Sequence, residues 1–234
     1  MLDLGFTLSM ATLIALLKVI AIDLILSGDN AIVIAMATRK LPHNKRNVAI
    51  FWGTGGAVVL RILFASVIVM LLEIPLVHFF GGLLLVIIAY KVLVNNEEES
   101  TNVKAKDSTI QAIGTIIAAD AVMSLDNVVA VAGASGGHIL ILAFGVLISI
   151  PIMIFGSKII VRFMEKYAWI AYVGSGILAW TAGDMIIGDE KIMEWFNIEQ
   201  GPIHYVFTII VTVLVLLLGY MKNKKAASTA PSSH

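Results

Sequence analysis

The sequence lacks cysteine and has few charged residues. With no cysteine among its 234 residues, disulfides, thiolate metal sites and cysteine nucleophiles are excluded. Charged residues make up 14% of the chain, whereas a soluble domain carries about 25% to keep its surface in water. The formal net charge is +0, so no excess of positive charge points to nucleic acid. A lipid bilayer is therefore the expected partner of this surface, and nucleic acid is not.

Long apolar runs fill most of the chain, which is 59% hydrophobic with a mean hydropathy of +0.95. A bilayer core of about 30 Å needs about 20 apolar residues for each crossing helix. No positive residue precedes the first run, so we expect it to be a retained span rather than a cleaved signal. We predict an all-α integral membrane protein with about seven transmembrane helices, at residues 12–37, 48–72, 76–94, 109–134, 139–161, 169–188 and 203–220.

The positive residues outside these spans gather on one side of the membrane. If the spans alternate in direction, the opposite side holds Lys191 beside the acidic residues Asp189, Glu190 and Glu194. Cytoplasmic loops are enriched in Lys and Arg, so we expect the N-terminus outside and the C-terminus in the cytoplasm. The cytoplasmic set is Arg39, Lys40, Lys45, Arg46, Lys104, Lys106, Lys158, Arg162, Lys166, Lys222, Lys224 and Lys225.

An internal repeat carries the polar residues of the spans. Residues 21–37 read AIDLILSGDNAIVIAMA and residues 118–134 read AADAVMSLDNVVAVAGA, with the same D-x-x-x-S-x-D-N pattern. Weaker similarity follows in the second helices, around Gly53 and Gly145, and in the third helices. Since each copy has an odd number of spans, the copies enter the membrane from opposite sides, an arrangement that recurs in transporters. The predicted organisation is 1–94, first three-helix repeat; 95–108, cytoplasmic linker; 109–188, second three-helix repeat; and 189–234, seventh helix and cytoplasmic tail.

Four aspartates lie inside predicted spans: Asp23, Asp29, Asp120 and Asp126. An ionised Asp at the bilayer centre costs about 2.5–3.5 kcal/mol on the insertion scale. The cationic residues within spans are Lys18, Arg61 and Lys91, too few to neutralise all four. A bound metal ion or protons would supply the missing positive charge, and paired aspartates also suit proton coupling.

The spacing around the first motif favours a shared site. Ser27 and Asn30 lie on the same helix face as Asp23, whereas Asp29 points inward only if the helix unwinds at Ser27 and Gly28. Carboxylate, amide and carbonyl oxygens suit Mg²⁺, Ca²⁺ and Mn²⁺, and this chemistry does not separate the three ions. The histidines fall at span ends or outside spans, at His43, His78, His138, His204 and His234.

Further residues are expected to assist ion movement or charge balance. Arg61 would balance the carboxylates when no ion is bound. Lys91 matches Asp184 in the register of the repeat, although both lie near span ends, where an interfacial role is an equal alternative. The accessory set is Ser27, Gly28, Arg61, Lys91, Ser124 and Asp184.

The two motifs, DLILSGDNAIVIAMA at 23–37 and DAVMSLDNVVAVAGA at 120–134, resemble the duplicated motif of the TerC family of integral membrane proteins, and within it the YjbE/YkoY-type bacterial members. The resemblance extends to WGTGGAVVLRI and GGLLLVIIAYK and covers the first six helices. It implies manganese efflux across the bacterial plasma (inner) membrane, with Mn²⁺ as the transported ion and no organic cofactor. Carried over by position, the metal ligands fall on Asp23, Asp29, Asn30, Asp120, Asp126 and Asn127.

Other functions fit some of these features. A transporter of another substrate, such as Ca²⁺, an amino acid, or Na⁺ in exchange for H⁺, would also use buried carboxylates. An intramembrane aspartyl protease uses two aspartates on neighbouring helices, but the sequence has no GxGD motif, so we expect a transporter rather than an enzyme. A protein that only holds metal for assembly of another protein is a further alternative. The sequence does not indicate an oligomeric state.

Overall fold

The computed structural model describes residues 10–72, 74–94, 105–136, 138–196 and 201–229. Every regular element in these ranges is a helix, so the prediction of an all-α protein is confirmed for the described part of the chain. The helices are α1 (Met10–Leu26), α2 (Gly28–Thr38), α3 (His43–Leu72), α4 (Val77–Leu93), α6 (Ala105–Ala134), α7 (Ile139–Lys166), α8 (Trp169–Ile187), α9 (Glu190–Phe196) and α10 (Pro202–Thr229).

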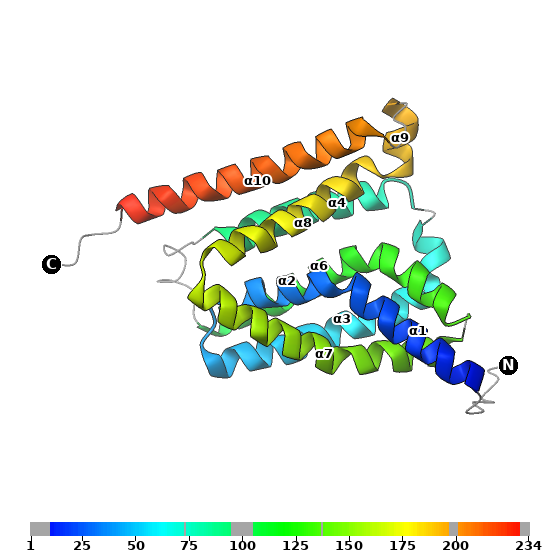
Figure 1. Ribbon diagram of the computed structural model, residues 1–234. Helices are drawn as coiled ribbons and strands as arrows, with labels where there is room; N and C mark the ends of the chain where they lie inside the picture. Colours follow the sequence, from blue (N-terminus) through cyan, green and yellow to red (C-terminus); the bar gives the residue numbers. More distant parts are fainter. Residues whose placement is uncertain (1–9, 73, 95–104, 137, 197–200, 230–234) are drawn as a thin grey trace.

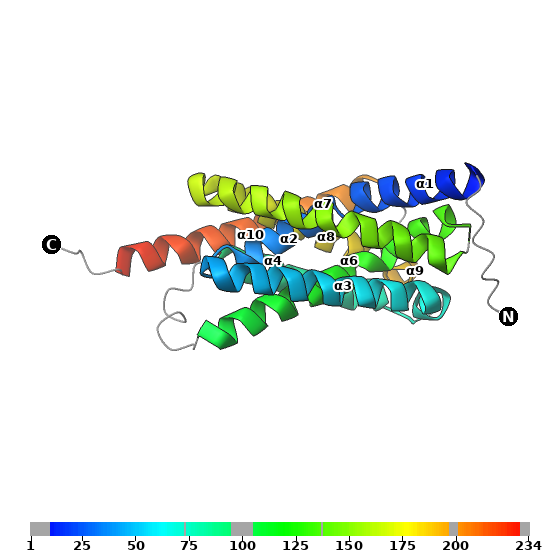
Figure 2. The ribbon, with the colours of Figure 1, turned by 90° about the horizontal axis from the view of Figure 1, so that it is seen from below.

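The long helices lie side by side in one elongated bundle, and α1 begins at one end of it while α10 finishes at the other (Figure 1). Helix α10 packs against α8 at one edge, and α4 packs against α8 beside it. Seen from below, α1 runs alongside α7, and α3 runs alongside α6 (Figure 2). Helices far apart in the sequence therefore form the closest pairs.

The lengths and surfaces of these helices suit a bilayer. Among the described residues, 5 helices are long and apolar enough to cross a membrane, and α1 and α2 together form a broken span bent by 50°. Helix α4 is apolar but has 17 residues. Large apolar side chains face outward, including Phe51, Phe155 and Ile210, as expected where lipid replaces water. The chain is thus an integral membrane protein with several spans.

Some helix bounds differ from the predicted ones. Helix α6 begins at Ala105, inside the predicted linker 95–108, of which residues 95–104 lie outside the described ranges. Helices α3 and α7 extend several residues beyond their predicted spans, because polar and basic residues can continue a helix past the membrane. The short helix α9 was not predicted, since its 7 residues give too little apolar periodicity to detect.

Glycines allow two pairs of helices to approach closely. A Cβ atom added to Gly53 of α3 would lie 2.7 Å from the Ile116 side chain of α6. A Cβ atom added to Gly145 of α7 would overlap the side chain of Val19 in α1. These contacts bring α3 close to α6 and α1 close to α7, and α1, α3 and α6 also carry polar residues described next.

Basic side chains close the end of the bundle where α2 finishes. Arg39 Nη2 donates to the Val92 carbonyl at 3.1 Å, and Lys40 Nζ donates to the Val94 carbonyl at 2.9 Å. Arg46 donates to the Thr38 carbonyl at 3.3 Å. These cations satisfy carbonyl groups at the carboxyl ends of α4 and α2 and interact favourably with the helix dipoles. Burial lowers the pKa of the Arg39 guanidinium from its usual value.

Candidate cation site

A group of polar residues lies in the interior where α1 ends, α2 begins, and α3 and α6 pass. Helix α1 supplies Asp23, Ser27 lies at the break between α1 and α2, and α3 supplies Arg61. Helix α6 supplies Asp120 and Ser124. All of these residues are buried, with Arg61 only 1% exposed although it is among the largest polar side chains. Such burial of charge is stable only when the charges are paired.

Arg61 bridges the two copies of the repeated motif. Its Nη1 atom donates to Asp23 Oδ1 and, at 2.8 Å, to the Ser27 hydroxyl. Its Nη2 atom donates to Asp120 Oδ1 at 2.7 Å, and its Nε atom donates to the Ser124 hydroxyl at 3.1 Å. One guanidinium therefore neutralises part of the charge of both aspartates and binds both serines.

Each serine also binds the aspartate four residues earlier in its own copy. The Ser27 hydroxyl lies 3.3 Å from Asp23 Oδ1, and the Ser124 hydroxyl lies 3.1 Å from Asp120 Oδ2. A spacing of four residues places the two side chains on one helix face, which is why the D-x-x-x-S pattern forms this pair twice. The serines thus hold the carboxylates in place around Arg61.

The two asparagines bind across the copies, but in different ways. Asn30 donates from Nδ2 to Asp120 Oδ1 at 2.7 Å. Asn127 donates from Nδ2 to the backbone carbonyl of Leu26 at 3.1 Å. Leu26 is the last residue of α1, and Ser27 has non-helical angles of φ −100° and ψ 12°. Asn127 therefore satisfies a carbonyl at the helix break.

The break falls at Ser27 and Gly28, where the sequence predicted it, and places Asp29 in the first turn of α2. Asp29 is partly buried, and its Oδ1 atom accepts the Asn30 backbone N–H at 2.9 Å. Gly28 is exposed. The second copy is not broken, because α6 runs continuously through Leu125, the residue that replaces Gly28. The side chain of Asp126 lies outside the described part of the structure.

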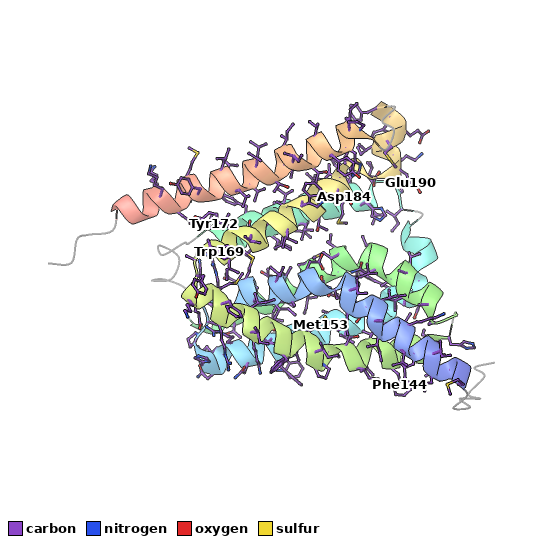
Figure 3. All side chains as sticks on the ribbon, viewed as in Figure 1. Phe144, Met153, Trp169, Tyr172, Asp184 and Glu190 are labelled. Atoms are coloured by element: carbon purple, nitrogen blue, oxygen red, sulfur yellow. The ribbon has the colours of Figure 1, made fainter. Side chains whose placement is uncertain are left out.

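Two of the predicted accessory residues, Lys91 and Asp184, do not join this group. Lys91 is exposed in the last turn of α4. Asp184 lies near the far end of α8, close to Glu190 (Figure 3), and its Oδ1 atom is 2.6 Å from His204 Nε2. The register of the repeat aligned them, and each lies in the last turn of its helix, but α4 and α8 are antiparallel, so the two residues lie at opposite ends of this helix pair. Asp184, Glu190 and His204 instead line an open hollow of about 570 Å³.

Thr54 of α3 is a polar residue of this region that the sequence analysis missed. It lines a cavity of about 10 Å³ together with Asn30, Asp120 and Met153. Its hydroxyl group is buried and has no hydrogen-bond partner among the described residues. The available signal was its spacing, because Thr54 lies seven residues before Arg61 and thus on the same face of α3.

The side-chain atoms of this group that could bind a cation are oxygens. Asp23 Oδ2, Asn30 Oδ1 and the Thr54 hydroxyl are buried without hydrogen-bond partners in the described part of the chain, so they are available as acceptors. No three His, Asp or Glu side chains of the described set are placed to hold a metal ion together. Arg61 instead lies between Asp23 and Asp120 and forms an ion pair with each.

This chain is similar to known proteins over nearly its whole length. The model of the "Integral membrane protein TerC family" matches residues 8–227. The "Uncharacterized membrane protein YjbE" of Bacillus subtilis (strain 168) is 43% identical over 205 residues, covering 88% of this chain and 93% of that protein. The inner membrane protein YgdQ of Escherichia coli (strain K12) is 28% identical, covering 87% of this chain and 90% of that protein. No solved structure matches.

Proposed function

Because the chain belongs to the TerC family of integral membrane proteins, we propose that it exports a divalent cation, manganese, through the site that its two motifs share. The observation that carries this proposal is the buried oxygen cluster around Arg61. Burying two aspartates and an arginine costs free energy, and a protein with apolar residues of similar size at these positions is often more stable. A structural role alone therefore does not account for these residues. Ionisable residues inside a membrane are by default functional.

The charge of the cluster favours a divalent ion. When ionised, Asp23, Asp29 and Asp120 oppose one guanidinium, Arg61, which leaves a formal charge of −2 on these described residues. One divalent cation would neutralise that charge, whereas one sodium ion or proton would not. In a medium of low dielectric constant, net neutrality decides which occupant is stable.

The oxygen donors favour Mn²⁺, Mg²⁺ or Ca²⁺ over softer metals. Carboxylate, amide and hydroxyl oxygens are hard ligands, and the chain has no cysteine to attract copper or zinc. Among the hard cations, the resemblance of the motifs to the TerC family supports manganese. The relatives' names give a membrane location and no substrate.

We also propose the inverted-repeat architecture with seven spans, counting the broken pair α1–α2 as one and α4 as another. Two close contacts support it. The offset of 97 that aligns the motifs also aligns Val19 with Ile116, and the second helices align Gly53 with Gly145. Gly53 packs on Ile116, and Gly145 packs on Val19, so the two contacts exchange when the copies exchange. A two-fold axis between the copies would produce this reciprocity.

In the proposed orientation the basic end of the bundle, with Arg39, Lys40 and Arg46, faces the bacterial cytoplasm. The end with Asp184 and Glu190 faces outward (Figure 3). An ion from the cytoplasm would reach the cluster along α2 and compete with Arg61 for Asp23 and Asp120. Release of the arginine from one copy of the motif would let the copies move apart, as alternating access requires.

Whole-cell metal content tests the function. Bacteria that lack the protein should retain excess manganese and grow poorly in high manganese, and the wild-type gene should restore both. Asp29→Asn should fail to restore efflux, because it removes a charge at the site without separating Arg61 from its partners. The matched control, Asp184→Asn, changes an aspartate outside the cluster and should restore efflux. Unchanged manganese with altered sodium, calcium or amino-acid content would refute manganese export in favour of that substrate, and no change in any of them would refute transport.

A further inference from the structure

We propose that α2 is a hinged gate at the cytoplasmic side, closed in this structure, and that Arg39 and Lys40 form the latch that holds it against α4. This inference rests on the proposed function and orientation, and adds a moving part to them. Helix α2 has 11 residues, with the cation cluster at its start and the basic residues at its end. Transporters use such half-helices, interrupted at the substrate site, to open and close access to that site.

The hinge lies at Ser27 and Gly28. Ser27 has non-helical backbone angles, and α1 and α2 meet there at a bend of 50°. A Cβ atom added to Gly28 would meet nothing within 4 Å, so no described side chain fills the space beside the break. Dihedral changes at a few such positions can swing a helix as a rigid body. A swing here would move Asn30, in the first turn of α2, away from Asp120.

The latch lies at the other end of α2. Arg39 Nη2 donates to the Val92 carbonyl at 3.1 Å, and Lys40 Nζ donates to the Val94 carbonyl at 2.9 Å. Arg and Lys ordinarily extend their charged ends into water. Here both bind the carboxyl end of a helix that is 53 and 54 residues away in the sequence. Hydrogen bonds from charged donors are roughly twice as strong as neutral ones, so this pair can fix the end of α2.

Between its two ends, α2 is held by apolar contacts. Its buried apolar side chains are Ala31, Val33, Ile34, Ala35 and Met36. Apolar contacts have no preferred direction, so they permit a small shift of the helix that hydrogen bonds would resist. Side-chain hydrogen bonds join α2 and the turn after it to other helices at Asn30 and at the latch. Release of the latch would therefore free the cytoplasmic end of α2 to move about the hinge.

Helix α4 is held firmly by its neighbours, so it can serve as the anchor of the latch. Ser175 of α8 donates to the Ala89 carbonyl at 3.0 Å, and Asn223 of α10 donates to the Leu93 carbonyl at 3.3 Å. Helices α4, α8 and α10 lie together along one edge of the bundle (Figure 1). The latch thus ties the hinged helix to a braced part of the molecule.

The latch closes the ion path by charge as well as by shape. While it is bound, two positive charges, those of Arg39 and Lys40, lie at the cytoplasmic end of the path along α2. Like charges repel, and the repulsion is strongest where little water screens it. A divalent cation would therefore enter when α2 and these two side chains move away from α4.

Thiol labelling tests the latch, since the chain has no cysteine of its own. Thr38, the last residue of α2, is 0% exposed, so Thr38→Cys should react slowly. Adding Arg39→Met and Lys40→Met keeps the side chains long but removes their donors. This should speed labelling by about tenfold or more, because losing one hydrogen bond from a charged donor shifts an equilibrium by about that factor. Adding Arg39→Lys and Lys40→Arg instead keeps both donors and should leave labelling slow.

The matched control for this labelling is Ser157→Cys, at a buried position of α7 that is also 0% exposed. Its reaction rate should not change when Arg39 and Lys40 are replaced by methionine. Equal acceleration at positions 38 and 157 would mean that the whole protein had loosened, and no acceleration at position 38 would mean that these residues do not hold α2. Either result would overturn the latch. If Thr38→Cys does not fold, crosslinking decides.

Crosslinking tests the gate during transport. Lys40→Cys and Val92→Cys, joined by a flexible thiol-specific linker that reduction cleaves, should lose the Mn²⁺ efflux of the unlinked pair and regain it on reduction. The control joins Val92→Cys to Lys222→Cys of α10, which ties α4 to a helix outside the gate, and should keep efflux. Efflux by the linked Lys40–Val92 pair would overturn the gate and leave the proposed function standing. No Mn²⁺ efflux by the wild type would overturn the proposed function, and with it the role of the gate in transport, whatever the labelling shows.

Discussion

Asn30, in the first copy of the motif, donates its side-chain N–H to Asp120 in the second copy at 2.7 Å, although the two residues are 90 positions apart. Asp120 also accepts from Arg61, which binds Asp23 of the first copy. The duplicated sequence therefore builds one site from two halves and not two separate sites. A ligand that contacts Asp120 would therefore act on residues bonded to both copies of the motif. Substrate sites at the interface between two repeats have this property.

We expect Asn127→Ala to lower the stability of the helix break. The substitution leaves the Leu26 carbonyl without its 3.1 Å donor, and an unsatisfied polar group in a part-buried position costs about 1 kcal/mol or more. Thermal unfolding of the purified protein should show a lower midpoint. Asn44→Ala, at an exposed position in the first turn of α3, is the control and should leave the midpoint unchanged. Equal midpoints for Asn127→Ala and the wild type would show that the break does not depend on this bond.

The close contact of α7 with α1 predicts a second stability effect. Gly145→Ala places a methyl group onto Val19, and overpacking of this kind costs about 1–3 kcal/mol. Val19→Ala should restore part of the loss in the double variant, because it removes the methyl groups that collide. Gly156→Ala is the control in the same helix, since a Cβ atom there meets nothing within 4 Å. If Gly145→Ala melted like Gly156→Ala, the contact between the helices would be looser than described here.

The local chemistry of the site could be predicted from the sequence because it depends on short spacings. Asp23 with Ser27 and Asp120 with Ser124 are four residues apart, and Gly28 marks the place where a helix can break. The group of residues around Arg61 was also predictable, since few partners exist in a membrane for a buried cation. These features follow from helix geometry and from the cost of burying charge.

The remaining features depend on how the helices pack. The role of Asn127 required knowing that the Leu26 carbonyl of another helix lies within its reach. Thr54 carries no signal in the sequence other than its spacing from Arg61, and most threonines in spans bond to their own helix. Lys91 and Asp184 were grouped with the site by their register in the repeat, but α4 and α8 are antiparallel, so aligned positions lie at opposite ends of the helix pair. Asp184 pairs instead with His204, which lies in a helix outside the repeat.

A reporter fusion tests the orientation. A reporter that works only in the cytoplasm should be active when fused at Lys222, at the same end of the bundle as the basic cluster. The same reporter inserted after Gly136, between α6 and α7 at the other end, should be inactive. A second reporter that works only outside the cytoplasm should give the opposite result at each position. A fusion that is active with one of the two reporters is expressed, so this pair of reporters controls for expression. Activity at Gly136 and none at Lys222 would reverse the orientation and the direction of the proposed ion path along α2.

The Arg61 bridge predicts how metal affinity should depend on pH. With Arg61 in place, Asp23 and Asp120 share one guanidinium, which supplies part of the counter-charge that protons would otherwise supply. Mn²⁺ then displaces a guanidinium rather than protons. We therefore expect the Mn²⁺ affinity of the wild-type protein to vary little between about pH 5.5 and 8.

Removal of the arginine should change this behaviour. In Arg61→Ala the two carboxylates have lost their counter-charge, and burial and mutual repulsion then favour bound protons. Mn²⁺ must displace those protons, so its affinity should fall by about tenfold for each unit of decreasing pH over the range where one proton is displaced. The matched control is Arg46→Ala, which removes a buried arginine at the basic end and should keep the flat wild-type profile. A steep profile in the wild type would mean that protons share the site with Arg61. Flat profiles in both the wild type and Arg61→Ala would mean that metal binding displaces no proton at these aspartates, and that export is not coupled to protons through them.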